Sequence, residues 1–243
     1  MGATRGKNIR TDGGLDGLIL YLDAANKRSY SGSGTNVSSL IGSMADGTLT
    51  NGVGFTSDDG GSFTFDGVND YISIPDDDVF SFGNSSTDSP FSLEVWVNMV
   101  TWRPLINKIA NNMREWTLVV GSGGNLVFVL YSYQSNFAYQ YIDAGDITSY
   151  ENQWVNIAAT YDGRGAPSPY NGMNLYINGS LQSVSKVSNG TYIALGNYTE
   201  PVKIGRQDSL YANGKISVAK IYNKELSASE VLHNYNLLKG RFS

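Results

Sequence analysis

The chain of 243 residues contains no cysteine and a single histidine, and both scarcities limit its chemistry. Without cysteine there is no disulfide, no thiolate metal site and no thiol nucleophile. A Ser-His-Asp arrangement would have to use His233, which lies beside Leu232 in a predicted terminal helix, where a surface histidine is the simpler interpretation. The sequence also lacks a Walker phosphate loop, a Gly-x-Gly-x-x-Gly turn after a strand and a His-Glu-x-x-His zinc motif. We therefore predict that the protein is not an enzyme.

The sequence also lacks long apolar runs and an excess of basic residues after its first segment. No stretch of about 18 apolar residues occurs, and the opening MGATRGKNIRTDGG has no apolar segment of the kind that a secretory signal needs. We therefore expect no membrane insertion, no signal peptide and synthesis in a cytoplasm. The net charge is −5 although the chain starts with Arg5, Lys7 and Arg10, so the remainder is more acidic still. This balance argues against nucleic acid as a partner.

The basic start, residues 1–13, is predicted to be a flexible arm. It has too little apolar surface to fold alone, so a partner would have to order it. Arg5, Lys7 and Arg10 would dock the arm on an acidic partner, and the alternative is a solvated charged terminus without a docking role.

Signals for β-strands and turns are abundant. The chain holds 28 glycines and 16 tyrosines, and short runs with alternating apolar residues recur between turn residues. The clearest runs are GLILYLD, SFTFDG, YISIP, FSLEVWVNMV, EWTLVV, NLVFVLYS, WVNIAATY and MNLYING. Ser122–Asn125 and Asn178–Gly179 predict hairpin turns. Because no helical pattern alternates with the strands, an all-β, two-sheet antiparallel sandwich is favoured.

One short helix is predicted at the C-terminus. Ser227 and Glu230 form a capping-box pattern, after which apolar residues follow at helical spacing. These residues are Val231, Leu232, Tyr235 and Leu238. We find no repeat and no linker, so residues 14–243 are predicted to form one domain.

Five stretches in this order resemble the laminin-G-like, concanavalin A-type lectin/glucanase superfamily. They are FTFDGVNDYISIP, FSLEVWVN, WVNIAATYDG with LYINGSL, VKIGR, and NGKISVAKIYNKELSASEVLHNYN. The resemblance implies an antiparallel jelly roll. The opening GLDGLILYLDAANKRSYSGSGT and the ending LSASEVLHNYNLLKGRF are similar to single-domain members found among bacteriophage virion proteins. This second resemblance implies a place in a virion, with carbohydrate or other capsid or tail proteins as partners, and it makes a homo-oligomer natural.

Some proteins with this jelly roll are glycoside hydrolases, which need two carboxylates at one site. The corresponding strand offers Glu94, but Trp96 and Asn98 stand at the next positions of the same face. Glu94 is therefore interpreted as a solvent-facing or hydrogen-bonded strand residue. A hydrolase or polysaccharide lyase with an unusual site, for example one that pairs Glu94 with Glu115, is the alternative.

Three oxygen-bearing side chains, Asp66, Asn69 and Asp70, lie within five residues between two predicted strands. Carboxylate and amide oxygens suit calcium, and loops of the resembled superfamily often supply them. Distant loops would have to complete such a site, with Asp58, Asp59, Asp76–Asp78 and Asp208 as candidates. The alternative is that Asp66 and Gly67 form a turn in which the Asp side chain accepts local backbone hydrogen bonds.

Aromatic residues dominate the stretch YSYQSNFAYQY. Those that share one strand parity are Tyr131, Tyr133, Phe137, Tyr139 and Tyr141. If Gln134–Asn136 forms the turn of a hairpin, the rings would stack on one sheet face and could bind sugars, whose C–H groups pack on aromatic rings. The alternative is that these rings fill the core between the sheets. Trp102 and Arg103, in a predicted loop, form a second candidate surface, and there the alternative is a loop anchor.

The pattern as a whole favours a non-catalytic, lectin-like virion surface protein. It would decorate a capsid or tail, or bind carbohydrate on a host surface.

Overall fold

Alternation of side chains divides each central strand between two environments. In β10 (Asn125–Tyr131), Leu126, Phe128 and Leu130 enter the main hydrophobic core, whereas Val129 and Tyr131 pack in a separate cluster on the opposite face. A period of two is what a strand imposes on its side chains. The computed structural model describes residues 16–42, 46–101, 104–110, 112–133 and 138–242.

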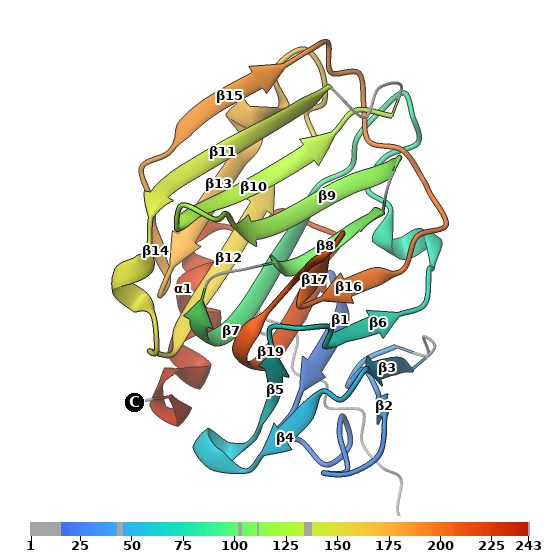
Figure 1. The fold of residues 1–243 in the computed structure, drawn as a ribbon. Coiled ribbons are helices and arrows are strands. Elements are labelled where there is room, and N and C mark those ends of the chain that lie inside the picture. Colours follow the sequence, from blue (N-terminus) through green and yellow to red (C-terminus); the bar gives the residue numbers. More distant parts are fainter. Residues whose placement is uncertain (1–15, 43–45, 102–103, 111, 134–137, 243) are drawn as a thin grey trace, which may run out of the picture.

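Two large antiparallel sheets stack around the main core (Figure 1). The eight-stranded sheet has the order β14-β13-β12-β7-β19-β5-β4, and β1 also pairs with β19. Its strands are β1 (Leu18–Asp23), β4 (Gly54–Thr56), β5 (Ser62–Asp66), β7 (Phe91–Thr101), β12 (Val155–Tyr161), β13 (Met173–Ile177), β14 (Ser180–Leu181) and β19 (Asn213–Tyr222).

The nine-stranded sheet has the order β15-β11-β10-β9-β8-β16-β6-β3-β2 and lies nearer the viewer in Figure 1. Besides β10, its strands are β2 (Asn36–Val37), β3 (Gly47–Thr50), β6 (Tyr71–Ile74), β8 (Pro104–Ala110), β9 (Met113–Val120), β11 (Tyr139–Asp146), β15 (Ser185–Asn189) and β16 (Val202–Ile204). A small hairpin of β17 (Arg206–Gln207) and β18 (Leu210–Tyr211) completes the strands. The predicted antiparallel jelly-roll sandwich is confirmed.

The predicted hairpin turns are also confirmed. β9 pairs with β10 around a turn in which Gly124 has φ of 83°, and the Gly124 amide donates to the Gly121 carbonyl at 2.9 Å. β13 pairs with β14 through Asn178 and Gly179, which both have positive φ. Asn and Gly tolerate this left-handed backbone at low cost, which is why these pairs fix a hairpin locally.

The terminal helix α1 (Ala228–Leu238) begins with the predicted capping box. The Ser227 hydroxyl accepts from the Glu230 amide at 3.3 Å, and the Glu230 carboxylate accepts from the Ser227 amide at 2.8 Å. The predicted apolar face is only partly right, because Leu232 is 46% exposed whereas Asn234 is buried. No helix within the described ranges is long and apolar enough to cross a membrane. Short 3-10 turns lie at Asp58–Gly60, Asp78–Phe80, Thr148–Tyr150, Pro169–Gly172 and Lys239–Arg241.

Helix α1 covers the outer face of the eight-stranded sheet and explains a difference from the sequence-based expectation. β7 was expected to have one buried face, yet Glu94 and Trp96 on its second face are 1% and 2% exposed. Asn234 of α1 donates to Glu94, and the rings of Tyr235 and Phe242 stack on Trp96 at centroid distances of 5.6 and 4.4 Å. Both faces of β7 are therefore buried.

Candidate functional site

Three tyrosines of the predicted aromatic stretch gather on the outer face of the nine-stranded sheet. Tyr131 of β10 lies directly opposite Tyr139 of β11, and their ring centroids are 6.1 Å apart in an edge-on arrangement. Tyr139 and Tyr141 stack at 6.0 Å with 30° between their planes. We call Tyr131, Tyr139 and Tyr141 the tyrosine strip. Since the strip packs with Ile109 and Val129 in its own cluster, the alternative that these rings fill the core between the sheets is wrong.

The members of the strip differ in exposure. Tyr131 is 8% exposed, whereas Tyr139 and Tyr141 are half-buried and present part of their rings to solvent. The guanidinium carbon of Arg114 lies 5.5 Å from the Tyr131 ring centroid. Burial raises the pKa of Tyr131, and the neighbouring Arg114 opposes this shift. The strip therefore consists of two half-buried stacked rings beside a buried third ring.

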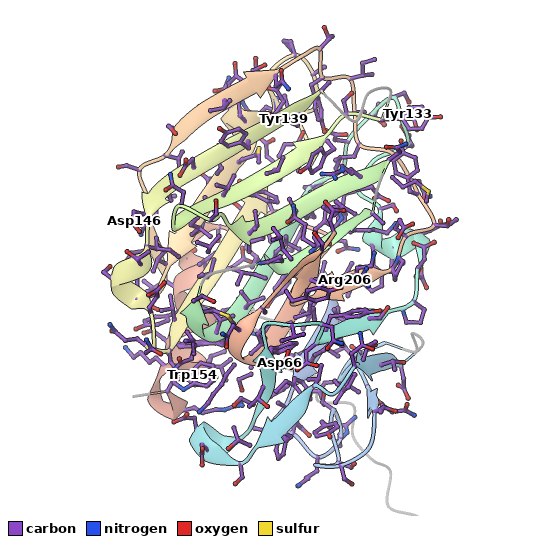
Figure 2. All side chains as sticks on the ribbon, viewed as in Figure 1. Asp66, Tyr133, Tyr139, Asp146, Trp154 and Arg206 are labelled. Carbon is purple, nitrogen blue, oxygen red and sulfur yellow. The ribbon has the colours of Figure 1, made fainter. Side chains whose placement is uncertain are left out.

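A pocket of about 500 Å³ lies beside the strip. Its lining residues are Ile109, Ala110, Arg114, Lys203, Arg206, Asp208, Ser209 and Tyr211. We call it the cationic pocket, because it contains three basic side chains and one acidic one. Ile109 and Arg114 belong to its wall and also contact the strip, so the two features are continuous. Figure 2 shows Tyr139 and Arg206 on the same side of the nine-stranded sheet.

The β17–β18 hairpin forms one wall of the cationic pocket and is fixed to the sheet below. The Asn107 side chain donates to the Arg206 carbonyl at 2.6 Å, and the Thr117 hydroxyl donates to the Gln207 side chain at 3.0 Å. At the hairpin tip Asp208 pairs with Arg114 at 2.9 Å. The wall is thus held by contacts to β8 and β9.

A second pocket, of about 430 Å³, lies at the other end of β11. It is lined by Asn125, Asp143, Ala144, Gly145, Ser183, Val184 and Ser185. Asp143 shares the outward face with Tyr139 and Tyr141 because it follows them at a period of two, and it accepts a hydrogen bond from Asn125 at 2.9 Å. The outer face therefore presents carboxylate and amide groups, then aromatic rings, then cations.

Tyr133, another predicted sugar-binding residue, does not join the strip. Tyr133 is 41% exposed but stacks on Tyr198 at 5.9 Å instead, because β10 ends at Tyr131 and strand parity ends with it. Its inclusion in one row of rings was therefore wrong. Phe137, Trp102 and Arg103 lie outside the described residues, as do the predicted docking residues Arg5, Lys7 and Arg10.

The Asp66–Asp70 stretch forms a turn, as one of the two interpretations expected. Asp66 accepts from the Val68 amide at 2.8 Å, Gly67 has φ of 81°, and Asp70 accepts from the Asp66 amide at 3.2 Å. The turn carries the chain from β5 in one sheet to β6 in the other, so it is a crossing between layers. Burial, followed by the negative charge of Asp66, raises the pKa of Asp70, which is 3% exposed.

The same turn supplies few free ligands for calcium, which takes six to eight oxygens. One Asp70 oxygen, Oδ1, is buried without a hydrogen-bond partner, while Asn69 is exposed. Three of the residues proposed to complete a site are engaged elsewhere, Asp59 with Trp154, Asp76 with Lys108 and Asp208 with Arg114. Within the part of the chain that the structure describes, no group of three His, Cys, Asp or Glu side chains could hold a metal. A calcium site remains a prediction.

The two carboxylates of the hydrolase alternative lie in different sheets and in separate networks. Glu94 accepts from Asn156 and Asn234 at 3.1 and 3.0 Å and pairs with Lys220 at 3.3 Å, all beneath α1. Glu115 pairs instead with Lys108, at 2.6 Å, and is 0% exposed. Glu94 is thus hydrogen-bonded as expected but not solvent-facing. Since Glu94 and Glu115 share no partner, this pair does not form a two-carboxylate site. His233 is exposed on α1, in line with its simpler interpretation.

The family model described as the concanavalin A-like lectin/glucanases superfamily matches residues 65–232, which is more than half of the chain. The chain belongs to this superfamily. Searching the curated proteins produced no match.

Several solved structures superpose on about nine tenths of the chain. The binding domain of Paraclostridial Mosquitocidal Protein 1 has a TM-score of 0.66 at 17% identity, covering 91% of this chain and 52% of that one. The receptor binding domain of botulinum neurotoxin D has a TM-score of 0.64 at 19% identity, and the match covers 91% of this chain and 52% of that one. A third structure is Domain 4 of AbnA, a GH43 extracellular arabinanase from Geobacillus stearothermophilus, in complex with arabinotriose. Its TM-score is 0.61 at 17% identity, and the match covers 89% of this chain and 97% of that one. The chain thus spans about half the length of the toxin domains, and at these identities the likeness shows the fold.

Proposed function

We propose that this superfamily member is a non-enzymatic carbohydrate-binding domain that holds a glycan on the tyrosine strip. The observation that carries the proposal is the stacked pair Tyr139 and Tyr141, half-buried on the outer sheet face and separate from the main core. Aromatic rings placed in this way bind the apolar faces of sugar rings, while adjacent polar groups bind hydroxyls. Asp143 and Asn125 at one end of the strip are suited to the second task.

The dimensions of this surface fit a chain of sugars better than a single one. Tyr139 and Asp143 are four residues apart on β11, a separation of about 13 Å at strand rise. The cationic pocket extends the surface beyond the other side of the strip. An oligosaccharide that crosses the sheet from β11 over β10 and β9 to β8 could therefore contact all three regions.

Structural relatives give independent support. Domain 4 of AbnA was solved with arabinotriose, and a botulinum neurotoxin DC binding domain was solved with SialylT. The AbnA domain is matched over nearly its full length, whereas the toxin domains are matched over about half of theirs. Binding domains therefore recur among the neighbours of this fold, which favours recognition over catalysis for this chain.

A glycan-array screen of the purified chain tests the proposal, with and without millimolar calcium. We expect binding to a defined glycan class that Tyr139→Ala weakens at least about tenfold, because an accessible stacking ring is lost. Tyr235→Ala is the matched control, since it removes a stacked tyrosine from the opposite side of the molecule. Equal binding by wild type and Tyr139→Ala would refute the strip as the site. Loss of binding in chelator would support calcium.

We also propose that the domain is displayed on a phage particle, where it decorates the capsid or tail or binds host carbohydrate. The support is the similarity of residues 14–35 and 226–242 to single-domain virion proteins. Mass spectrometry of purified particles from a phage that encodes the chain should detect it at structural copy number. Its absence from the particles would refute this location. Light scattering of the purified chain will measure whether it forms the predicted homo-oligomer.

A further inference from the structure

The cationic pocket contains a guanidinium that is held in place but not neutralised. Arg206 lies over the rings of Tyr71 and Tyr211, with its guanidinium carbon 4.8 and 5.6 Å from the two centroids. Its Nε donates to the Asp208 carbonyl at 3.1 Å, which orients the guanidinium plane. Cation–π contacts of this kind fix an arginine while leaving its charge uncompensated.

The other basic groups of the pocket are paired. Arg114 pairs with Asp208 at 2.9 Å, and Lys203 pairs with Glu200 at 3.2 Å while also donating to the Ile109 carbonyl. Among the described residues, no carboxylate pairs with Arg206. The pocket therefore holds one unmatched positive charge in a half-buried position beside the tyrosine strip.

We infer that the cationic pocket binds the acidic group of a sugar whose neighbouring units lie on the tyrosine strip, so that the ligand is an acidic glycan. A carboxylate fits the planar donor fork of Arg206 in a bidentate arrangement. Continuity through Ile109 and Arg114 joins this charge to the stacking surface, which favours a sugar acid over a free anion. This inference rests on the proposed function of the strip.

The net negative charge of the protein disfavours an acidic glycan, so binding of such a glycan depends on the local contact with Arg206. The chain has a net charge of −5 and so repels acidic polymers at a distance. Preference for an acidic over a neutral glycan must then come from the pocket itself. Substituting Arg206 should remove the preference without removing the stacking contribution.

Matched ligand pairs test this directly by biolayer interferometry on immobilised glycans. The pairs are sialyllactose and lactose, oligogalacturonate and its carboxyl-reduced form, and sulfated and unsulfated galactan. We expect the wild type to bind one acidic member at least about tenfold more tightly than its neutral partner, the size of one charge-assisted contact. The carboxylated and sulfated pairs distinguish the two possible acids.

Four variants separate the inference from the proposed function. Arg206→Gln should bind both members of the pair equally, at the affinity that the wild type has for the neutral one, and Arg206→Lys should retain part of the preference. Tyr139→Ala should weaken both members, and the exposed Lys27→Gln is the charge-matched control. Retained preference in Arg206→Gln, with an unchanged melting temperature, would overturn the inference. Equal wild-type binding of both members would also overturn it while leaving the strip proposal intact, whereas no binding at all would refute both.

Discussion

At the scale of single residues, the behaviour of Asp70 can distinguish a simple hydrogen-bonded turn from a calcium site. Its pKa is raised in the folded state, so the folded protein holds this proton more tightly than the unfolded chain. The unfolding free energy that Asp70 contributes is therefore highest at low pH and falls as pH rises through the folded pKa. At neutral pH the ionised carboxylate is a cost, because one of its oxygens is buried without a partner.

Asp70→Asn should therefore stabilise the metal-free protein at pH 7, by up to about 1 kcal/mol, since the amide oxygen can still accept from the Asp66 amide. The gain should disappear as pH approaches the unfolded value of about 3.9. Urea unfolding in chelator between pH 4 and 8 measures it, with the exposed Asp46→Asn as control. A loss of stability that appears only with calcium present would instead show that Asp70 is a calcium ligand.

Lys108 is a second residue for which the effect of a substitution on the unfolding free energy can be predicted. It is 0% exposed and its ammonium contacts Glu115 at 2.6 Å, Asp76 at 2.9 Å and the Tyr198 carbonyl. Lys108→Met would leave Glu115 buried without its cation, at a cost of about 3–5 kcal/mol.

The pH dependence identifies the cause of that loss. Burial raises the pKa of Glu115 even while Lys108 opposes the shift, and without Lys108 it should rise further. The deficit of Lys108→Met should therefore grow as pH rises from 4 to 8. Adding Glu115→Gln should recover much of the stability at pH 8. A deficit that does not change with pH would mean that lost packing, not the buried charge, is responsible.

At the scale of elements, α1 can be weakened without touching the proposed glycan surface, because it packs on the other sheet. Ser227→Ala removes the capping hydroxyl and should lower the unfolding free energy by about 1 kcal/mol. Ser229→Ala, an exposed position in the same first turn, should cause no comparable loss. Thermal unfolding and glycan titration of both variants provide the measurement. A change in glycan affinity for Ser227→Ala would mean that the two faces are coupled.

Local signals explain which elements could be predicted from the sequence. The Asn178–Gly179 turn and the Ser227–Glu230 capping box depend on neighbouring residues, so their structures follow from short stretches. The residue at which a strand ends depends less on neighbouring residues in the sequence. The parity that correctly placed Tyr131 with Tyr139 failed at Tyr133, because nothing in the sequence marks the end of β10.

Contacts between distant segments explain what could not be predicted. Arg206 ends the VKIGR stretch, in which nothing indicates a ligand-binding role, and only folding brings it over Tyr71 from another strand. The burial of Glu94 likewise depends on α1. The helical pattern alone does not predict that Asn234 of this helix faces the sheet and donates to Glu94. The tyrosines of the candidate site were therefore predictable from the sequence, whereas its cationic half required the sheet order.

At the scale of the whole molecule, the two outer faces differ in what covers them. The face of the eight-stranded sheet is covered by α1 and Phe242, which stack on Trp96. The face of the nine-stranded sheet carries the tyrosine strip and the cationic pocket. A ligand and a docking partner could therefore bind at different places, with the basic residues of the N-terminal arm serving the second.

Deleting residues 2–13 tests that division. The arm has little apolar surface, so its removal should shift the melting temperature by less than about 1 °C and leave glycan affinity unchanged. Particle attachment should be lost, because Arg5, Lys7 and Arg10 would no longer reach an acidic partner. Replacing these three residues with Gln in the full chain should have the same effect if charge is the cause. Particle binding by ultracentrifugation and calorimetry of the isolated chain measure the two properties, and a large fall in melting temperature would show that the arm is part of the fold.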